Sequence, residues 1–167
     1  AGVATVRANI AAVNPKAAVV SANSALRLDD PSLVAGKRVL VVEDGPTLTH
    51  GGMQIGAGTV AAQRFGAAEL IDPRPYLVGR LQETFETYPE IGTLLPAMGY
   101  GAEQLADLEA TIAATPAEAV VIGTPIDLAR VIHIAQPRAR VFYDLEEIGS
   151  PDLAGLIGDF LARRGPG

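Results

Sequence analysis

Four short runs of apolar, largely β-branched residues alternate with longer helical patterns, and this alternation constrains the fold more than any other feature. The run Arg38–Val42 is too short and too continuously apolar for a helix and is typical of a strand buried on both faces. Runs of the same type occur at 69–71, 118–122 and 140–143. Helical patterns occupy 59–65, 77–87, 103–114, 126–134 and 151–163. We therefore expect an α/β fold, a three-layer Rossmann-like domain with a mostly parallel sheet.

The N-terminal region predicts one more helix and one more strand. Apolar residues recur at helical spacing from Val3 to Val13, and this helix ends at Asn14 because the following proline disfavours helical backbone there. A strand is expected at 17–20, followed by a loop over 23–36. The segment 94–98 is ambiguous, since Pro96 lacks a backbone donor and allows only an edge strand or a loop.

The length of 167 residues, 49% of them hydrophobic, is enough for one self-sufficient core. We expect a single α/β domain over 1–162. Residues 163–167 are expected to be frayed. The chain starts at Ala1, without a methionine and inside a predicted helix, which suggests a piece of a longer protein, although processing after removal of the initiator methionine would leave the same first residue.

The composition excludes several kinds of chemistry and partner. The chain has no cysteine, so zinc–thiolate sites, iron–sulfur clusters and thiol nucleophiles are excluded. A net charge of -6 argues against nucleic acid as the principal partner. No apolar run approaches the roughly 18–20 residues of a membrane span, and the N-terminus lacks the apolar core of a secretion signal. We expect a cytoplasmic protein with no membrane partner, and the sequence leaves a homo-oligomer open.

The segment from Glu43 to Met53, directly after the first of the four runs, concentrates reactive side chains. In a parallel sheet, ligands bind beyond the carboxyl ends of the strands, which is where this segment begins. We expect Glu43 and Asp44 to bind Mg²⁺, with Asp44 also acting as a base and His50 transferring a proton. Hydroxyl and glycine N–H groups suit phosphate oxygens, and the residues that would supply them are Thr47, Thr49, Gly51 and Gly52. The alternative is a turn at 44–46 followed by an ordinary surface loop.

A glycine-rich motif follows this segment. Gly56-Ala57-Gly58-Thr59-Val60-Ala61 matches the fingerprint of dinucleotide-binding proteins, with Asp72 in the place of the ribose-binding acid. About a dozen residues separate Val42 from Gly56, whereas the fingerprint should follow its strand directly. A general phosphate site at this helix start is therefore favoured over a dinucleotide, and close packing of the glycines against the sheet is the structural alternative.

Polar residues also follow two later strands. The segment Asp72-Pro73-Arg74-Pro75-Tyr76 would hold Arg74 and Tyr76 on a stiff extended stretch, where Arg74 could pair with a phosphate or a carboxylate. A solvated arginine on a proline-stiffened loop is the alternative. The segment Gly123–Asp127 is best explained as a helix cap, with Thr124 as the N-cap residue and an acidic first turn.

Several blocks of sequence resemble nucleotide-dependent enzymes. Asn9-Ile10-x-x-x-Asn14-Pro15-Lys16-Ala17, followed by Ser21-Ala22, resembles the segment after the base-specificity motif of P-loop GTPases, and the resemblance implies that Ser21 and Ala22 contact the nucleotide base. The block 36–53, Gly-Lys-Arg-Val-Leu-Val-Val-Glu-Asp-Gly-Pro-Thr-Leu-Thr-His-Gly-Gly-Met, resembles the cyclic 2,3-diphosphoglycerate synthetase family, many of whose members are described as predicted GTPases. Further blocks that agree with this family are 65–69, 72–76, 95–101 and 121–128.

This resemblance covers nearly the whole chain and implies the C-terminal domain of a longer enzyme. It implies that 1–35 would be the trailing part of a P-loop domain and 36–162 the C-terminal domain proper. Such an enzyme would use ATP and Mg²⁺ to close a phosphoanhydride on 2,3-diphosphoglycerate. The chain's two lysines, Lys16 and Lys37, lie in no phosphate-binding loop, so this chain cannot by itself be a P-loop NTPase. The ATP or GTP would therefore be bound mainly by a preceding P-loop domain, which becomes the expected partner.

Three functional hypotheses follow for the chain. In the first, the domain presents the Glu43–Gly52 segment and Arg74 to a phosphorylated small molecule in a phosphoryl-transfer enzyme, a ligase, a cyclase or a GTPase. In the second, it is a noncatalytic module that binds a nucleotide or phosphometabolite or serves assembly. In the third, Gly56–Ala61 marks a dinucleotide-binding domain. Enzyme activity is expected for the parent protein and is left open for this chain alone.

Overall fold

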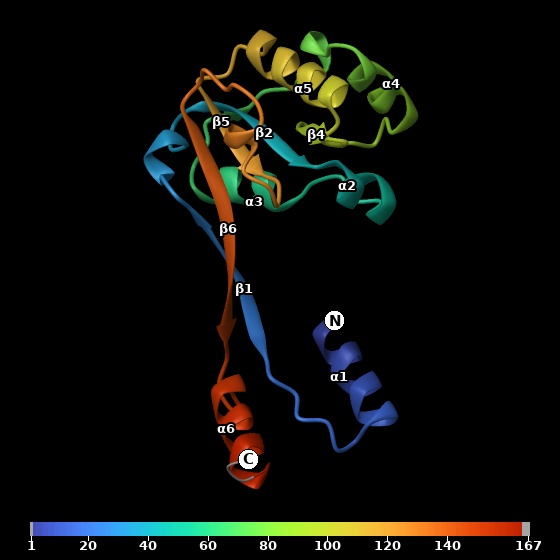
Figure 1. The fold of residues 1–167 in the computed structure, drawn as a ribbon, viewed down its shortest axis with the longest axis vertical. Helices are drawn as coiled ribbons and strands as arrows, with labels where there is room; N and C mark the ends of the chain where they lie inside the picture. Colours follow the sequence, from blue (N-terminus) through green and yellow to red (C-terminus); the bar gives the residue numbers. More distant parts are fainter. Residues whose placement is uncertain (1, 165–167) are drawn as a thin grey trace. The chain divides into compact units, whose positions relative to one another are not determined.

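The fold is that of a computed structural model, which describes residues 2–164 and is drawn in Figure 1. The strands are β1 (Ala22–Leu28), β2 (Arg38–Asp44), β3 (Glu69–Leu70), β4 (Leu95–Ala97), β5 (Ala119–Gly123) and β6 (Arg138–Glu147). The α-helices are α1 (Gly2–Val13), α2 (Gly45–Gly51), α3 (Ala57–Arg64), α4 (Arg80–Thr87), α5 (Ala102–Ala114) and α6 (Leu153–Arg164). Short 3-10 turns occur at η1 (Pro31–Leu33), η2 (Arg74–Tyr76) and η3 (Leu128–Arg130). The α/β class is confirmed.

The strands form one six-stranded, mostly parallel sheet in the order β1-β6-β5-β2-β3, with β4 paired to β2. Strand β2 is its centre, because it pairs in parallel with β5 on one side and with both β3 and β4 on the other. Its residues Val39–Val42 have no exposed surface at all. This burial on both faces is what the continuous apolar run predicted.

Helices cover both faces of the sheet, as expected for a Rossmann-like fold (Figure 1). Helix α3 packs against β2 and β5 and brings small residues to the sheet, so that a Cβ added at Gly58 would lie 2.9 Å from Cγ1 of Val41. Helices α4 and α5 pack against each other, and each buries a pair of apolar side chains four residues apart. These pairs are Leu81 with Phe85 and Leu108 with Ile112.

The chain divides into two compact units. One consists of Leu26–Tyr143 and contains the core and the candidate site, and the other groups the segment before it with the segment after it. The expected single domain over 1–162 stays a prediction, and residues 165–167 of the expected frayed end lie outside the described residues. Within residues 2–164, no helix has both the length and the apolar character needed to cross a bilayer.

Two predicted elements are wrong, for reasons of tertiary contact. No strand forms at 17–20, and β1 lies instead at Ala22–Leu28, inside the predicted loop, where β6 provides its hydrogen-bonding partner. The predicted helix at 126–134 is reduced to the single turn η3. There the backbone N–H of His133 donates to Oε2 of Glu109 in α5, so a side chain from another element supplies a partner that a helix would have supplied locally. The ambiguous segment 94–98 does contain a strand, β4. In the described part of the sheet β4 pairs with β2, so the missing N–H of Pro96 is compatible with its position at an edge.

The buried centre of β2 gives a test of this packing. Replacing Leu40, which is fully buried, by alanine is expected to lower the free energy of unfolding by about 2–5 kcal/mol, since it leaves a cavity between the sheet and its helices. Urea denaturation measures the loss. Val131→Ala, at an exposed position, is the matched control and should change stability by less than about 0.5 kcal/mol. Equal effects of the two variants would contradict the assigned core.

Candidate functional site

The carboxyl ends of β2, β4 and β5 meet at one edge of the sheet. The register pairs Glu43 of β2 with Gly123 of β5, and Asp44 with Ala97 of β4. A hollow of about 240 Å³ opens at this edge. Its described lining residues are Glu43, Asp44, Thr47, Leu48, Met53, Gly56, Ala57, Gly123, Pro125 and Tyr143. Its position is the one at which parallel α/β sheets bind ligands.

Glu43 is almost fully buried and holds the start of α3 against the sheet. Its Oε1 accepts hydrogen bonds from the backbone N–H groups of Gly56, at 3.2 Å, and Thr59, at 2.7 Å, and from the Thr59 hydroxyl at 3.0 Å. Its Oε2 accepts from the N–H of Gly58 at 3.1 Å. Burial raises the pKa of this carboxyl above its ordinary value, and the four hydrogen bonds act in the opposite direction. Both oxygens are therefore engaged by the protein.

The same contacts explain the glycine-rich motif. A Cβ added at Gly56 or at Gly123 would lie 2.5 Å from Oε2 of Glu43, so both glycines are needed for the carboxylate to fit. The N–H groups that a dinucleotide pyrophosphate would need at the start of α3 already donate to Glu43. The N–H groups of the motif thus bind a carboxylate of the protein itself. Close packing of the glycines against the sheet therefore explains the motif better than dinucleotide binding does.

Asp44 differs from Glu43 because it is only half-buried and faces the hollow. Its Oδ2 accepts a hydrogen bond of 2.6 Å from the Thr47 hydroxyl. Burial, and secondly the negative charge of Asp44, raise the pKa of the Tyr100 hydroxyl. This tyrosine therefore keeps its proton near neutral pH and remains a hydrogen-bond donor beside Asp44. Tyr100 and Tyr143 were not among the predicted site residues, although Tyr100 lies in the glycine-flanked segment that follows β4.

The predicted reactive loop is in fact the helix α2, in which proline occupies the first turn. Thr49 turns its hydroxyl back to the carbonyl oxygen of Gly45 at 3.2 Å. His50 and Gly51 belong to α2, but the His50 side chain and the surroundings of Gly51 lie outside what the structure describes. Gly52 ends the helix with a φ of 60°, a left-handed conformation that favours glycine. The roles predicted for these residues stay predictions.

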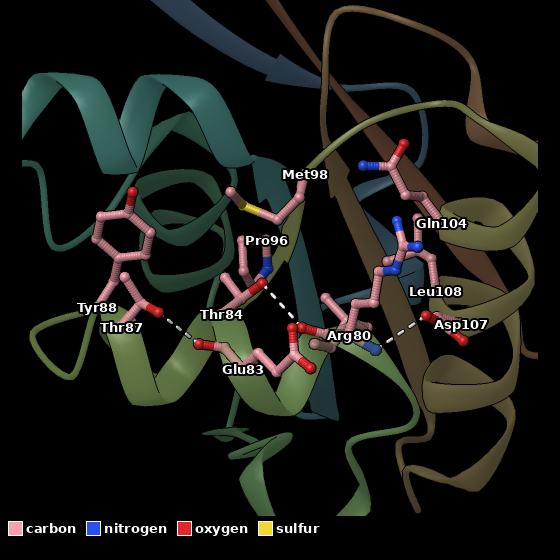
Figure 2. Close-up of a pocket in the computed structure, with 11 residues that line it drawn as sticks. Arg80, Glu83, Thr84, Thr87, Tyr88, Pro96, Met98, Gln104, Asp107 and Leu108 are labelled. Atoms are coloured by element: carbon pink, nitrogen blue, oxygen red, sulfur yellow. Dashed lines mark hydrogen bonds between the residues drawn. The ribbon is translucent and has the colours of Figure 1, made fainter.

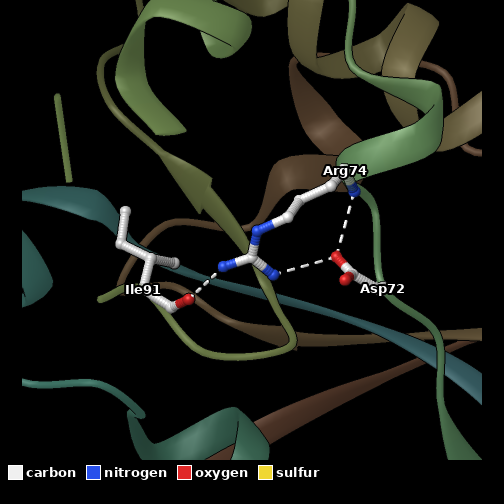
Figure 3. Close-up of polar contacts among 3 residues, drawn as sticks. All are labelled: Asp72, Arg74 and Ile91. Carbon is white, nitrogen blue, oxygen red and sulfur yellow. Dashed lines mark hydrogen bonds and ion pairs between the residues drawn. The ribbon is translucent and has the colours of Figure 1, made fainter. Parts of the chain in front are cut away.

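Arg74 is engaged in contacts within the protein (Figure 3). Its guanidinium donates to Oδ1 of Asp72 at 3.0 Å and to the carbonyl oxygen of Ile91, and it lies over the ring of Phe85 at 4.8 Å from the centroid. Arg74 and Tyr76 form the turn η2 rather than an extended segment. Neither is among the described residues that line the hollow at Asp44.

The remaining predicted residues lie elsewhere. Ser21 and Ala22 belong to the unit formed by the two end segments, where the Ser21 hydroxyl accepts a hydrogen bond from Arg7. Among residues 2–164, no group of three or more carboxylate or histidine side chains is arranged to hold a metal ion. With both Glu43 oxygens engaged, the predicted Mg²⁺ would find Asp44 as its one open carboxylate in the described lining, so the residues present fit a resident metal poorly.

A second hollow, of about 390 Å³, lies between α4, α5 and the end of β4 (Figure 2). Polar groups along it are paired with one another. The backbone N–H of Arg80 donates to Oδ2 of Asp107 at 3.0 Å, and the hydroxyls of Thr84 and Thr87 donate to backbone carbonyls one turn earlier in α4. Nothing in the sequence predicted this hollow, because it depends on how α4 and α5 pack.

Comparison with known proteins finds one curated relative. The chain is 55% identical over 155 residues to arginine synthetase ArcE of Thermococcus kodakarensis, and these residues cover 93% of this chain and 35% of that protein. The chain therefore spans about a third of the relative's length. The relative's name does not include the cyclic 2,3-diphosphoglycerate synthetase activity that the motifs suggested. No protein-family profile and no solved structure matches the chain.

The burial of Glu43 predicts a pH-dependent cost of replacing it. Glu43→Gln is expected to lower the free energy of unfolding by about 1–3 kcal/mol at pH 4.5, because the amide N–H₂ cannot accept from the N–H groups of α3. The difference should shrink as the pH rises from 4.5 through the raised pKa, since the folded protein holds this proton more tightly than the unfolded chain does. Urea denaturation at a series of pH values measures both effects, with exposed Glu86→Gln as control. A difference that grows with pH would contradict the burial.

The contacts of Arg74 predict a structural role that can be measured. Arg74→Gln is expected to lower the free energy of unfolding by about 1–3 kcal/mol, because it removes charge-assisted hydrogen bonds to Asp72 and Ile91. The control is Arg64→Gln at the exposed end of α3, which should cost less than about 0.5 kcal/mol. If the two variants are equally stable, Arg74 is free for a ligand and the phosphate-binding prediction gains support.

Proposed function

We propose that this chain is the substrate-binding domain of a nucleotide-dependent synthetase, and that the hollow at Asp44 binds a positively charged group of the substrate or product. Two observations support the proposal. The relative that matches most of the chain is named an arginine synthetase, and arginine carries a guanidinium cation. The hollow lies at the carboxyl edge of the sheet, where such folds bind ligands.

The charge of the hollow is the observation that favours a cationic ligand over a phosphate. Its described lining contains the carboxylates of Glu43 and Asp44 and no lysine or arginine. Arg74, the cation that the sequence suggested for a phosphate, is bound to Asp72 and Ile91. A naked phosphate would meet negative charge here, whereas a guanidinium could pair with Asp44 in a two-pronged hydrogen-bonded contact.

The other lining residues suit this task. Leu48, Met53, Pro125 and Tyr143 present apolar surface along which the methylene groups of an extended substrate could lie. Tyr100 is not in the described lining, but the charge of Asp44 acts on its hydroxyl, which keeps its proton and could donate a hydrogen bond to a substrate. ATP or GTP and its Mg²⁺ would be held mainly by another domain of the parent protein, and this chain would position the substrate for them.

A second candidate rests on the 36–53 block, which resembles the cyclic 2,3-diphosphoglycerate synthetase family. In that case a phosphorylated small molecule would bind at the same edge, with Mg²⁺ offsetting the charge of Asp44 and with most of the metal's ligands coming from the substrate and water. The Thr47 and Thr49 hydroxyls would have to leave their present partners in order to reach the phosphate.

Binding of 1-butylguanidine tests the leading proposal, since this ligand carries the guanidinium and apolar chain of arginine and nothing else. Asp44→Asn is expected to raise its Kd about tenfold or more, because the variant keeps the shape of the side chain and removes its charge. Isothermal titration calorimetry on the purified chain measures the Kd. The matched control is Asp159→Asn, an exposed carboxylate of α6, which should leave the Kd unchanged.

Two outcomes would overturn the proposal. In one, 1-butylguanidine fails to bind, and in the other it binds Asp44→Asn as tightly as the unchanged chain. If 2,3-diphosphoglycerate binds in the presence of Mg²⁺ while 1-butylguanidine does not, the second candidate replaces the first.

A further inference from the structure

A third hollow, of about 380 Å³, lies beside β6 and is lined by charged side chains of both signs. Its lining includes Arg138 and Arg140 together with Asp29 and Asp127. All four residues belong to the compact unit Leu26–Tyr143. In β6, Ala139 and Val141 are buried in the core, so the alternating residues Arg138, Arg140 and Phe142 share the opposite face of the strand.

The guanidinium of Arg140 has donors to spare. Its Nη2 donates to the carbonyl oxygen of Pro125 at 2.8 Å, but its Nη1 lies 3.9 Å from Oδ2 of Asp127, which is too long for a hydrogen bond. Its Nε is buried and finds no hydrogen-bond partner among the described residues. The ring of Phe142 supports the guanidinium from one side, at 5.3 Å from the ring centroid. A buried donor without a partner is costly, and the guanidinium has a second donor group, Nη1, that makes no hydrogen bond to Asp127 and could donate to an anion bound in this hollow.

Two carboxylates flank these cations and restrict the ligand. Asp29 accepts the backbone N–H of Arg140 at 2.8 Å, and Asp127 faces the Arg140 guanidinium. A phosphate dianion would be repelled by this pair, whereas a ligand with one carboxylate and one ammonium group would match both signs. Arg138 is exposed and forms no ion pair among the described residues, so it is available to a carboxylate.

We propose that this hollow binds the head group of an α-amino acid, with its carboxylate on Arg138 and Arg140 and its ammonium on Asp29 and Asp127. The inference deepens the proposed function and rests on it in one respect, namely that the amino acid is the synthetase's substrate or product. The segment Gly123–Asp127 links the two sites, because Pro125 lines the hollow at Asp44 and its carbonyl oxygen accepts from Arg140.

L-Norvaline tests the head-group site by itself, since it has the α-amino acid head group and a short apolar side chain without charge. It is expected to bind the purified chain at least about tenfold more tightly than butylamine, which lacks the carboxylate, or pentanoate, which lacks the ammonium. Kd values come from NMR titration, with backbone amide shifts expected at 127–129 and 138–142.

Variants assign the two charges. Arg138→Ala and Asp127→Asn should each weaken L-norvaline at least about fivefold, while Arg64→Ala, an exposed arginine on α3, should not. Since Arg138 is exposed, its loss leaves folding intact, and Asp127→Asn preserves the shape of the side chain. Equal affinity for the three ligands, or unchanged L-norvaline binding in both variants, overturns the head-group site.

Asp44→Asn separates the two proposals. L-Norvaline binding that persists in Asp44→Asn, together with a failure of 1-butylguanidine to bind, supports the head-group site and overturns the guanidinium site. If 1-butylguanidine binds and L-norvaline binds no more tightly than butylamine and pentanoate, the guanidinium site is supported and the head-group site is overturned. Loss of L-norvaline binding in Asp44→Asn, with Arg138→Ala unaffected, overturns the head-group site by placing the ligand in the other hollow.

Discussion

The hydrogen bonds between the Glu43 carboxylate and the start of α3 are the constraint on which the rest of the site depends. Four donors from Gly56, Gly58 and Thr59 converge on one buried side chain at the end of the central strand. The contact fixes where α3 begins and requires glycine at 56 and 123. The two adjacent carboxylates therefore have different roles. Glu43 is hydrogen-bonded within the protein, whereas Asp44 faces the hollow.

The arginines near the sheet, Arg74 and Arg140, form contacts within the protein and are not in the described lining of the hollow at its carboxyl edge. Arg74 is held by Asp72 and Ile91, and Arg140 donates to the carbonyl oxygen of Pro125. The described lining of the hollow at Asp44 therefore carries only negative charge, while that of the hollow beside β6 carries both signs. Two neighbouring sites of this kind suit a ligand with a cationic end and a zwitterionic end better than they suit a polyphosphate.

The sequence predicted elements well where burial alone decides the conformation. The apolar run at 38–42 became the fully buried centre of the sheet, and its length and β-branching left no other solution. The sequence-based prediction was wrong where a partner distant in the chain determines the secondary structure. The pattern at 126–134 has helical spacing, yet its backbone is bound by Glu109 from α5. Strand β1 forms at Ala22–Leu28 because β6 lies beside it, and nothing local in 17–28 distinguishes that register.

The candidate site shows the same division. The sequence by itself determined the α/β class, the order of most strands and helices and the edge of the sheet at which Asp44 lies, because these follow from hydrophobic periodicity and strand direction. Only the tertiary structure decided which polar residues are free. Whether Glu43, Arg74 or Arg140 binds a ligand or the protein depends on donors and acceptors that are brought together from separate strands and helices, and sequence spacing carries no record of those distances.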